Sequence, residues 1–197
     1  MKKLFFSILF TISVIAVNAG NPGNGVPIKV KPSESAIAWT AYKVTGKHHG
    51  LVAIKEGSLD IQDGLLTGGS FVIDMTSISV SDLQGNGKAK LESHLKSDDF
   101  FGVEQFPTAT LVITEAKSNG DGNYDIKANL TIKGITNPIA FNAIINQGGN
   151  TFKASADITV DRTLYNVRYG SGKFFENLGD ATISDEFVLN VSLVAGE

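Results

Sequence analysis

Two segments of the chain alternate apolar and polar residues without interruption, and this alternation constrains the fold more than any other feature of the sequence. Every second residue is apolar from Tyr124 to Ile132, and the same pattern runs from Phe152 to Val160. Successive side chains of a β-strand point to opposite faces, so a period of two predicts a strand with one buried face. The chain is therefore expected to be built around half-buried β-strands.

Similar but less regular alternation occupies most of the remaining chain. It is found in residues 36–44, 51–61, 65–78, 108–116, 139–146 and 185–194. Turn-forming residues separate these segments, at 63–64, 119–122, 134–138 and 147–150. About eight successive strands joined mostly by short turns favour an all-β fold, either a closed antiparallel barrel or a sandwich.

The alternation stops between Asp82 and Phe106. Leu91, Leu95 and Phe101 fall there on roughly helical spacing, which predicts one or two short helices packed across one end of the sheet. The aromatic residues of segment 94–107 are expected to pack onto the sheet, and Asp98 or Asp99 is expected to cap a helical turn.

Strand alternation also predicts which side chains face the interior. An eight-stranded barrel is just wide enough to be filled by side chains or to hold one small ligand. Small residues such as Ala128 and Ala154 on the inner face favour a cavity. The residues expected to point inward, and to contact a ligand if there is one, are Phe71, Ile73, Ile126, Ala128, Leu130, Phe141, Ala143, Phe152, Ala154, Ile158, Leu189 and Val191.

The N-terminus has the pattern of a secretory signal peptide. Lys2 and Lys3 precede an uncharged apolar run over residues 4–17, and Ala19 ends a small-residue cleavage site. The run is shorter than the roughly 20 residues that a membrane span needs. We expect residues 1–19 to be removed, residues 20–34 to form a lead-in, and residues 35–195 to form one barrel domain in the periplasm or outside the cell.

Chemical motifs are sparse. The sequence has no cysteine and no catalytic or phosphate-binding motif, so we expect no catalytic residue, no metal site and no cofactor. His48 and His49 are adjacent, so on a strand they cannot chelate one ion together, and a composite site with His94 is the less favoured alternative. The only arginines, Arg162 and Arg168, are expected either to bind a polar headgroup or to pair with nearby acids such as Asp157, Asp161 and Glu176. Basic residues are dispersed along the chain, so a nucleic-acid partner is not expected.

Several segments resemble the YceI-like family in order and spacing. They are residues 94–107, with the letters HLKSDDFFGVEQFP, residues 130–138, with LTIKGITNP, and Asp161-Arg162 followed by Tyr165. Residues 76–78, 174–180 and 185–187 are also similar to the family, and the resemblance extends over residues 35–193. Thr163 to Asn166 depart from the sequence that follows Asp-Arg in many relatives.

The resemblance implies a lipocalin-like eight-stranded antiparallel barrel, with one or two short helices beside it, that binds a polyisoprenoid or quinone-like lipid. An apolar site of this kind leaves almost no motif, because its lining resembles core. Two alternatives stay open from the residues alone: a filled barrel that acts as a protein-interaction module, and an enzyme acting on a lipid-like substrate. Strands that are apolar on both faces, as at Leu111 to Ile113, can pack against the helical insertion or a second subunit.

Overall fold

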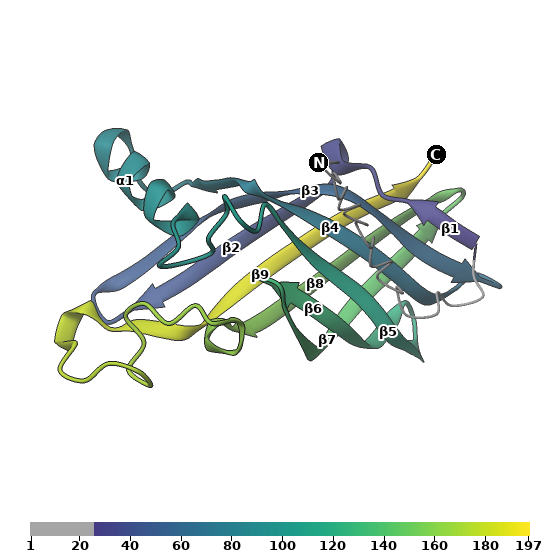
Figure 1. The fold of residues 1–197 in the computed structure, drawn as a ribbon. Helices are drawn as coiled ribbons and strands as arrows, with labels where there is room; N and C mark the ends of the chain where they lie inside the picture. Colours follow the sequence, from purple (N-terminus) through teal and green to yellow (C-terminus); the bar gives the residue numbers. More distant parts are fainter. Residues whose placement is uncertain (1–25) are drawn as a thin grey trace, which may run out of the picture.

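The computed structural model describes residues 26–197 (Figure 1). The expected signal peptide therefore lies outside the described residues. The strands are β1 (Val26–Lys29), β2 (Ala36–Lys43), β3 (Gly46–Gln62), β4 (Leu65–Val80), β5 (Thr108–Gly120), β6 (Asn123–Ile132), β7 (Ile135–Gly148), β8 (Thr151–Asp161) and β9 (Ile183–Gly196). The helices are α1 (Gly85–Lys96) and three short 3₁₀ turns, η1 (Pro32–Glu34), η2 (Arg162–Tyr165) and η3 (Gly179–Ala181).

The strands form a closed antiparallel barrel, which confirms the predicted fold class. Neighbours follow the order β1-β3-β2-β9-β8-β7-β6-β5-β4, and the additional pairing of β3 with β4 joins the two sides. β1 lies outside this circuit of eight strands. It pairs with residues 58–61 of β3, beyond the part of β3 that pairs with β2. The segment expected as a lead-in thus contributes a short strand, and β1 and β2 pair with successive parts of the same strand, β3.

The two ends of the barrel differ. One end carries the tight turns at 63–64, 121–122 and 149–150, together with β1 and the end of β9. The other end, called here the helix end, carries the β2–β3 and β6–β7 turns and the two long connections 81–107 and 162–182. In Figure 1 the helix α1 and the yellow-green connection before β9 lie together at this end, on the left.

Strand pairing is incomplete between β7 and β8. In the described chain the two strands pair only from Ala143↔Ala156 to Gly148↔Thr151, so residues 135–142 of β7 have no partner on that side. The turn η2 partly covers the opening, and the Asn137 side-chain amide donates to the Leu164 carbonyl at 3.0 Å.

Pro138 contributes to this open seam. The β6–β7 turn has only two residues, Lys133 and Gly134, both with positive φ, which is a twist-matched hairpin turn. Hydrogen-bonded and non-hydrogen-bonded pairs alternate from such a turn, so Asn129↔Pro138 is a non-hydrogen-bonded pair. In such a pair the backbone N–H points away from β6, so the N–H that Pro138 lacks is the one that would have faced β8. The predicted turn over 134–138 was too long, because β7 begins at Ile135.

The predicted helical insertion is a single helix followed by an irregular segment. Leu95 is buried, and β5 begins at Thr108, directly after Pro107. Backbone hydrogen bonds, such as Gly102 N–H to the Ser97 carbonyl at 2.8 Å, hold the irregular segment together. The expected capping by Asp98 or Asp99 was wrong, because both follow α1 and neither side chain accepts a hydrogen bond from the described residues.

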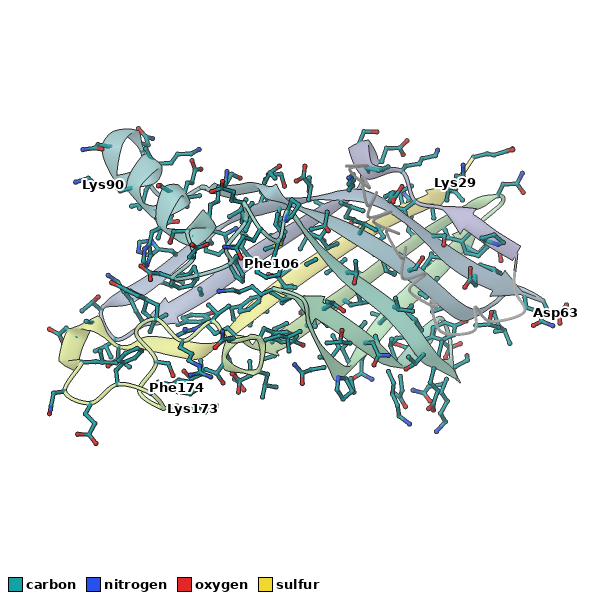
Figure 2. The ribbon with its side chains drawn as sticks, in the orientation of Figure 1. Lys29, Asp63, Lys90, Phe106, Lys173 and Phe174 are labelled. Atoms are coloured by element: carbon teal, nitrogen blue, oxygen red, sulfur yellow. The ribbon has the colours of Figure 1, made fainter. Side chains whose placement is uncertain are left out.

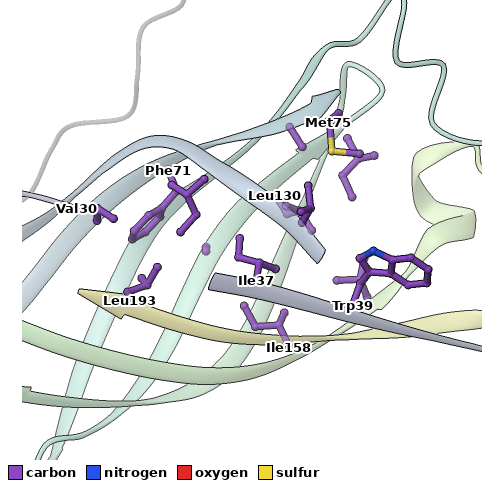
Figure 3. Packing of buried hydrophobic residues seen from close by; sticks show 14 of the residues in the cluster. Val30, Ile37, Trp39, Phe71, Met75, Leu130, Ile158 and Leu193 are labelled. Atoms are coloured by element: carbon purple, nitrogen blue, oxygen red, sulfur yellow. The ribbon is translucent and has the colours of Figure 1, made fainter. Parts of the chain in front are cut away.

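Buried side chains project into the barrel along its axis (Figure 3). Trp39 and Met75 lie toward one end, Val30, Phe71 and Leu193 toward the other, and Ile37 and Leu130 between them. The strict alternation of β6 in the sequence appears as an alternation of buried residues with exposed ones, or with a half-buried one at Thr131. The core is therefore the inside of the barrel, and any internal ligand must share that space.

Candidate functional site

Two adjoining cavities lie inside the barrel. The larger has a volume of about 160 Å³ and lies at the helix end. The smaller has a volume of about 100 Å³ and lies farther along the axis. Both are bordered by Ile37, Ile73, Leu130 and Leu189, so they follow one another inside the barrel. Their surfaces are almost wholly carbon, and an apolar cavity of this size stays dry and can take up an apolar molecule.

Most of the side chains predicted to face inward line these cavities. Ile73, Leu130 and Leu189 border both, and the smaller cavity is further lined by Phe71, Ile126, Phe141, Ala143, Ala154, Ile158 and Val191. Ala128 and Phe152 are also buried but line neither cavity. Ala128 is therefore not a position from which a larger side chain would directly block the cavity.

Sequence reasoning missed much of the larger cavity. Its lining includes residues from β2, β3, β4, α1 and β5, among them Trp39, Val52, Met75, Leu91 and Ala109. Residues 36–44 alternate only weakly, because Ala36, Ala38 and Ala41 blur the contrast between the two faces. The exposed face of β2 was thus not distinguishable from its inner face by apolar character alone.

Gly50 allows the single tryptophan to enter the cavity wall. Trp39 pairs with Gly50 across β2 and β3, and its indole N–H donates to the Ser79 carbonyl at 3.2 Å. A Cβ atom at position 50 would lie 2.8 Å from the Trp39 ring and would also collide with the Ser79 carbonyl. Glycine is therefore required where the tryptophan ring crosses the neighbouring strand.

Aromatic and aliphatic residues border the larger cavity at the helix end, on the side of α1. Leu91, Leu95, Phe100 and Phe101 border it from α1 and the segment that follows. Phe100 and Phe101 contact each other edge-on at 5.8 Å between ring centroids, and Phe101 contacts Phe187 of β9 at 6.4 Å. The expectation that this segment packs onto the barrel is met at these residues.

Arg162 forms a buried polar support beside the same cavity. Its side chain is 3% exposed and donates to three backbone carbonyls, of Val167 at 2.7 Å, Ser184 at 2.8 Å and Ile183 at 3.1 Å. Burial lowers the pKa of the guanidinium, against the opposing charges of Asp185 and Asp161. Arginine nevertheless stays charged at neutral pH.

The arginine pairings suggested by the sequence were wrong. Arg162 has its ion pair with Asp185, at 3.9 Å, rather than with Asp157, Asp161 or Glu176. Arg168 lies over the Phe174 ring, 4.6 Å from its centroid. Arg162 thus ties the connection before β9 to the barrel, which the sequence could not indicate because its acceptors are backbone groups.

Asp161 organises the turn that follows β8. Its carboxylate accepts hydrogen bonds from the Thr163 backbone and hydroxyl and from Lys173. Burial raises the pKa of Asp161, but these hydrogen bonds together outweigh it and lower the pKa below its ordinary value. The neighbouring Tyr165 is almost fully buried, and burial, reinforced by the charge of Asp161, raises the pKa of its phenol.

The histidines do not form a metal site. His48 and His49 pair with successive β2 residues, Ala41 and Thr40, so they point to opposite faces as predicted. His94 packs edge-on against Phe100 and Tyr169, at 5.2 and 4.5 Å between centroids. Among residues 26–197 no group of three or more His, Cys, Asp or Glu side chains could hold a metal ion.

Exposed apolar side chains collect around the helix end. They are Tyr42, Val44, Leu164, Tyr169, Phe174 and Phe175, each more than 40% exposed. Figure 2 shows Phe174 and Lys173 on the connection before β9. Hydrogen bonds from Val44 N–H to the Thr182 carbonyl and from Ile183 N–H to the Gly170 carbonyl bring this connection beside the β2–β3 turn. Tyr42 and Lys43 are exposed and also line the larger cavity, so the cavity reaches the surface beside this apolar rim. Within the described chain, no helix has both the length and the apolar character to cross a membrane.

Comparison with solved structures shows the same fold. The chain matches Burkholderia cenocepacia BcnA with a TM-score of 0.67 and 21% identity, covering 84% of this chain and 99% of that one. It matches a structure described as a polyisoprenoid binding domain from Saccharophagus degradans with a TM-score of 0.66 and 13% identity, covering 86% of this chain and 97% of that one. At these identities the likeness concerns the fold.

Sequence relatives carry the name UPF0312. A Shewanella baltica UPF0312 protein is 28% identical over 147 residues, which are 73% of each chain. A Pseudomonas aeruginosa UPF0312 protein is 48% identical over 61 residues, and the match spans only 31% of that protein's length. The model of the YceI-like domain matches residues 29–195, nearly the whole described barrel. The chain belongs to the YceI-like family.

Proposed function

We propose that this protein holds a long apolar isoprenoid chain inside its barrel and sequesters or carries it in the periplasm or outside the cell, after export directed by residues 1–19. The observation that carries the proposal is the pair of carbon-lined cavities along the barrel axis. Removing an apolar chain from water contributes about 0.8 kcal/mol per buried CH₂ group, so such a cavity needs few polar contacts for affinity.

The open end and the relatives favour a lipid over other apolar ligands. The rim of exposed aromatic and aliphatic residues extends apolar surface from the cavity to the outside of the molecule. The Saccharophagus degradans neighbour is described as binding polyisoprenoids. A filled barrel acting only through its surface would not need internal space, so the cavities disfavour that alternative. For an enzyme acting on a lipid-like substrate, the cavity lining offers His48 as a base and Ser184 as a hydroxyl, but no hydrogen bond joins the two among the described residues, so a nucleophile activated by a base does not support this alternative.

Titration of the lipid-free protein with isoprenoid alcohols of increasing length tests this proposal. Trp39 is the only tryptophan and lines the larger cavity, so its fluorescence should report occupancy. We expect saturable changes whose affinity rises by roughly an order of magnitude for every two CH₂ groups added inside the barrel, until the cavities are full. Affinity that does not depend on length, or no change with any isoprenoid, would contradict the proposal.

A further inference from the structure

A histidine held by a carboxylate lies at the mouth of the larger cavity. His48 borders the cavity from β3, and its cross-strand partner Ala41 borders it from β2. The last β3–β4 pair is Gly50↔Val80, so His48 lies in the part of the β2–β3 hairpin that extends beyond the closed wall. Asp82, two residues after β4, reaches back to this hairpin.

Two hydrogen bonds fix this arrangement. His48 Nδ1 lies 2.7 Å from one Asp82 carboxylate oxygen, and the His49 backbone N–H donates to the other at 3.0 Å. Burial raises the pKa of Asp82, but the hydrogen bonds from His49 and His48 outweigh it and lower the pKa, so the carboxylate is ionised at neutral pH. An ionised carboxylate only accepts hydrogen bonds, so Nδ1 must carry the proton.

The orientation of His48 leaves one nitrogen available to a ligand. With the proton on Nδ1, Nε2 of the neutral ring is a hydrogen-bond acceptor. No residue of the described chain donates to Nε2. The side chain is 29% exposed, so the ring touches both the cavity and the solvent at its mouth.

The cavity itself offers no place for a polar group. Its surface is almost wholly carbon, and a hydroxyl buried there would lose its hydrogen bonds to water without replacement. The Arg162 donors beside the cavity are already directed at three backbone carbonyls. An amphiphile with its apolar chain inside the barrel therefore keeps its polar end at the mouth. Lys43 also borders the mouth, but it is a flexible donor that offers no acceptor.

We propose that His48, positioned by Asp82, accepts a hydrogen bond from a hydroxyl at the polar end of the ligand, so that the barrel selects hydroxyl-bearing isoprenoids such as prenols and isoprenoid phenols. This inference rests on the proposed lipid-binding function. The ligand must therefore carry a polar hydrogen that it can donate to His48 Nε2. Because the site is partly exposed, the preference should be modest, about five- to tenfold over a ligand that lacks the hydroxyl.

The test compares two ligands with the same isoprenoid chain, in one of which a methyl group replaces the hydroxyl hydrogen. Geranylgeraniol and its methyl ether have the same chain, but only the alcohol can donate to Nε2. Trp39 fluorescence measures the affinity of both for lipid-free wild type and for His48→Phe, Asp82→Asn and the control His49→Phe. Phenylalanine keeps an aromatic wall at position 48 without an acceptor. His49 lies on the opposite face of the strand, and its contact with Asp82 is made by the backbone.

We expect wild type and His49→Phe to bind the alcohol about five- to tenfold more tightly than the ether. In His48→Phe the two affinities should become equal through weaker binding of the alcohol, with the ether unchanged. In Asp82→Asn the preference should fall, because the imidazole loses its fixed orientation. Rescue of part of the preference by His48→Gln, whose amide oxygen is an acceptor, would separate hydrogen bonding from wall packing.

The contrary results distinguish failure of the His48 role from failure of lipid binding itself. Equal affinities in wild type, or a preference that survives in His48→Phe, would contradict the role of His48 while leaving lipid binding intact. If neither ligand binds to folded wild-type protein, both the proposed function and this inference fail. Tighter binding of geranylgeranyl phosphate than of the alcohol, lost in Lys43→Gln, would replace the hydroxyl class by an anionic headgroup.

Discussion

We expect replacement of Arg162 by leucine to lower the free energy of unfolding by about 3–5 kcal/mol. The substitution removes charged donors from the carbonyls of Val167, Ile183 and Ser184, which lie 2.7–3.1 Å from the guanidinium. Buried acceptors left without donors lose their hydration without compensation, and Asp185 loses its positive partner. Urea denaturation, followed by far-UV circular dichroism, measures the change.

Arg168 provides the matched control. It is the only other arginine, it is exposed, and its contact is with the face of Phe174. Arg168→Leu should change the free energy of unfolding by at most about 1 kcal/mol. Comparable losses in the two variants would show that the carbonyl network of Arg162 is not what stabilises the connection before β9.

The second large effect concerns the cavity. We expect Ala109→Phe to lower the affinity for a long isoprenoid about a hundredfold. Ala109 is buried and lines the larger cavity, so a phenyl ring at this position occupies space that the ligand needs. Displacing three or four CH₂ groups removes about 2.5–3 kcal/mol of binding free energy. Retained lipid, quantified after organic extraction, measures the loss together with the Trp39 titration.

Ala140→Phe is the control for this variant. Ala140 lies on the exposed face of β7 and lines neither cavity, so the same substitution there should leave lipid content unchanged. Circular dichroism of both variants verifies that the barrel is intact. Equal lipid content in wild type and a folded Ala109→Phe variant would place the ligand outside the larger cavity.

Strand alternation predicted the barrel well where one face is buried and the other is solvated. β6 is the clearest case, since residues 123–132 alternate in the structure as they do in the sequence. The start of β7 was misplaced because Gly134, Thr136, Asn137 and Pro138 have the composition of a turn. Only Lys133 and Gly134 form the turn, and Pro138 remains in a strand because its β8 side has no hydrogen-bonding partner. Pro138 is thus consistent with the missing β7–β8 pairing, but this could be inferred only after the β6–β7 register was known.

The candidate site was less predictable because it depends on contacts between distant segments. His48 and Asp82 are 34 residues apart, and no local pattern relates them. Likewise the larger cavity joins β2, α1 and the start of β5, whose apolar residues look like ordinary core in the sequence. Alternation can identify inward positions, as at Ile73, Leu130 and Leu189, but it cannot show where packing leaves space between them.

Native mass spectrometry tests the central proposal most directly. The protein is expressed with its own residues 1–19, purified without detergent and analysed before and after organic extraction. We predict a species heavier than the polypeptide by one lipid, lost on extraction, whose fragments are spaced by isoprene units. A polypeptide that carries no lipid after gentle purification, or that carries only straight-chain acyl lipids, would contradict the proposal that the barrel holds an isoprenoid.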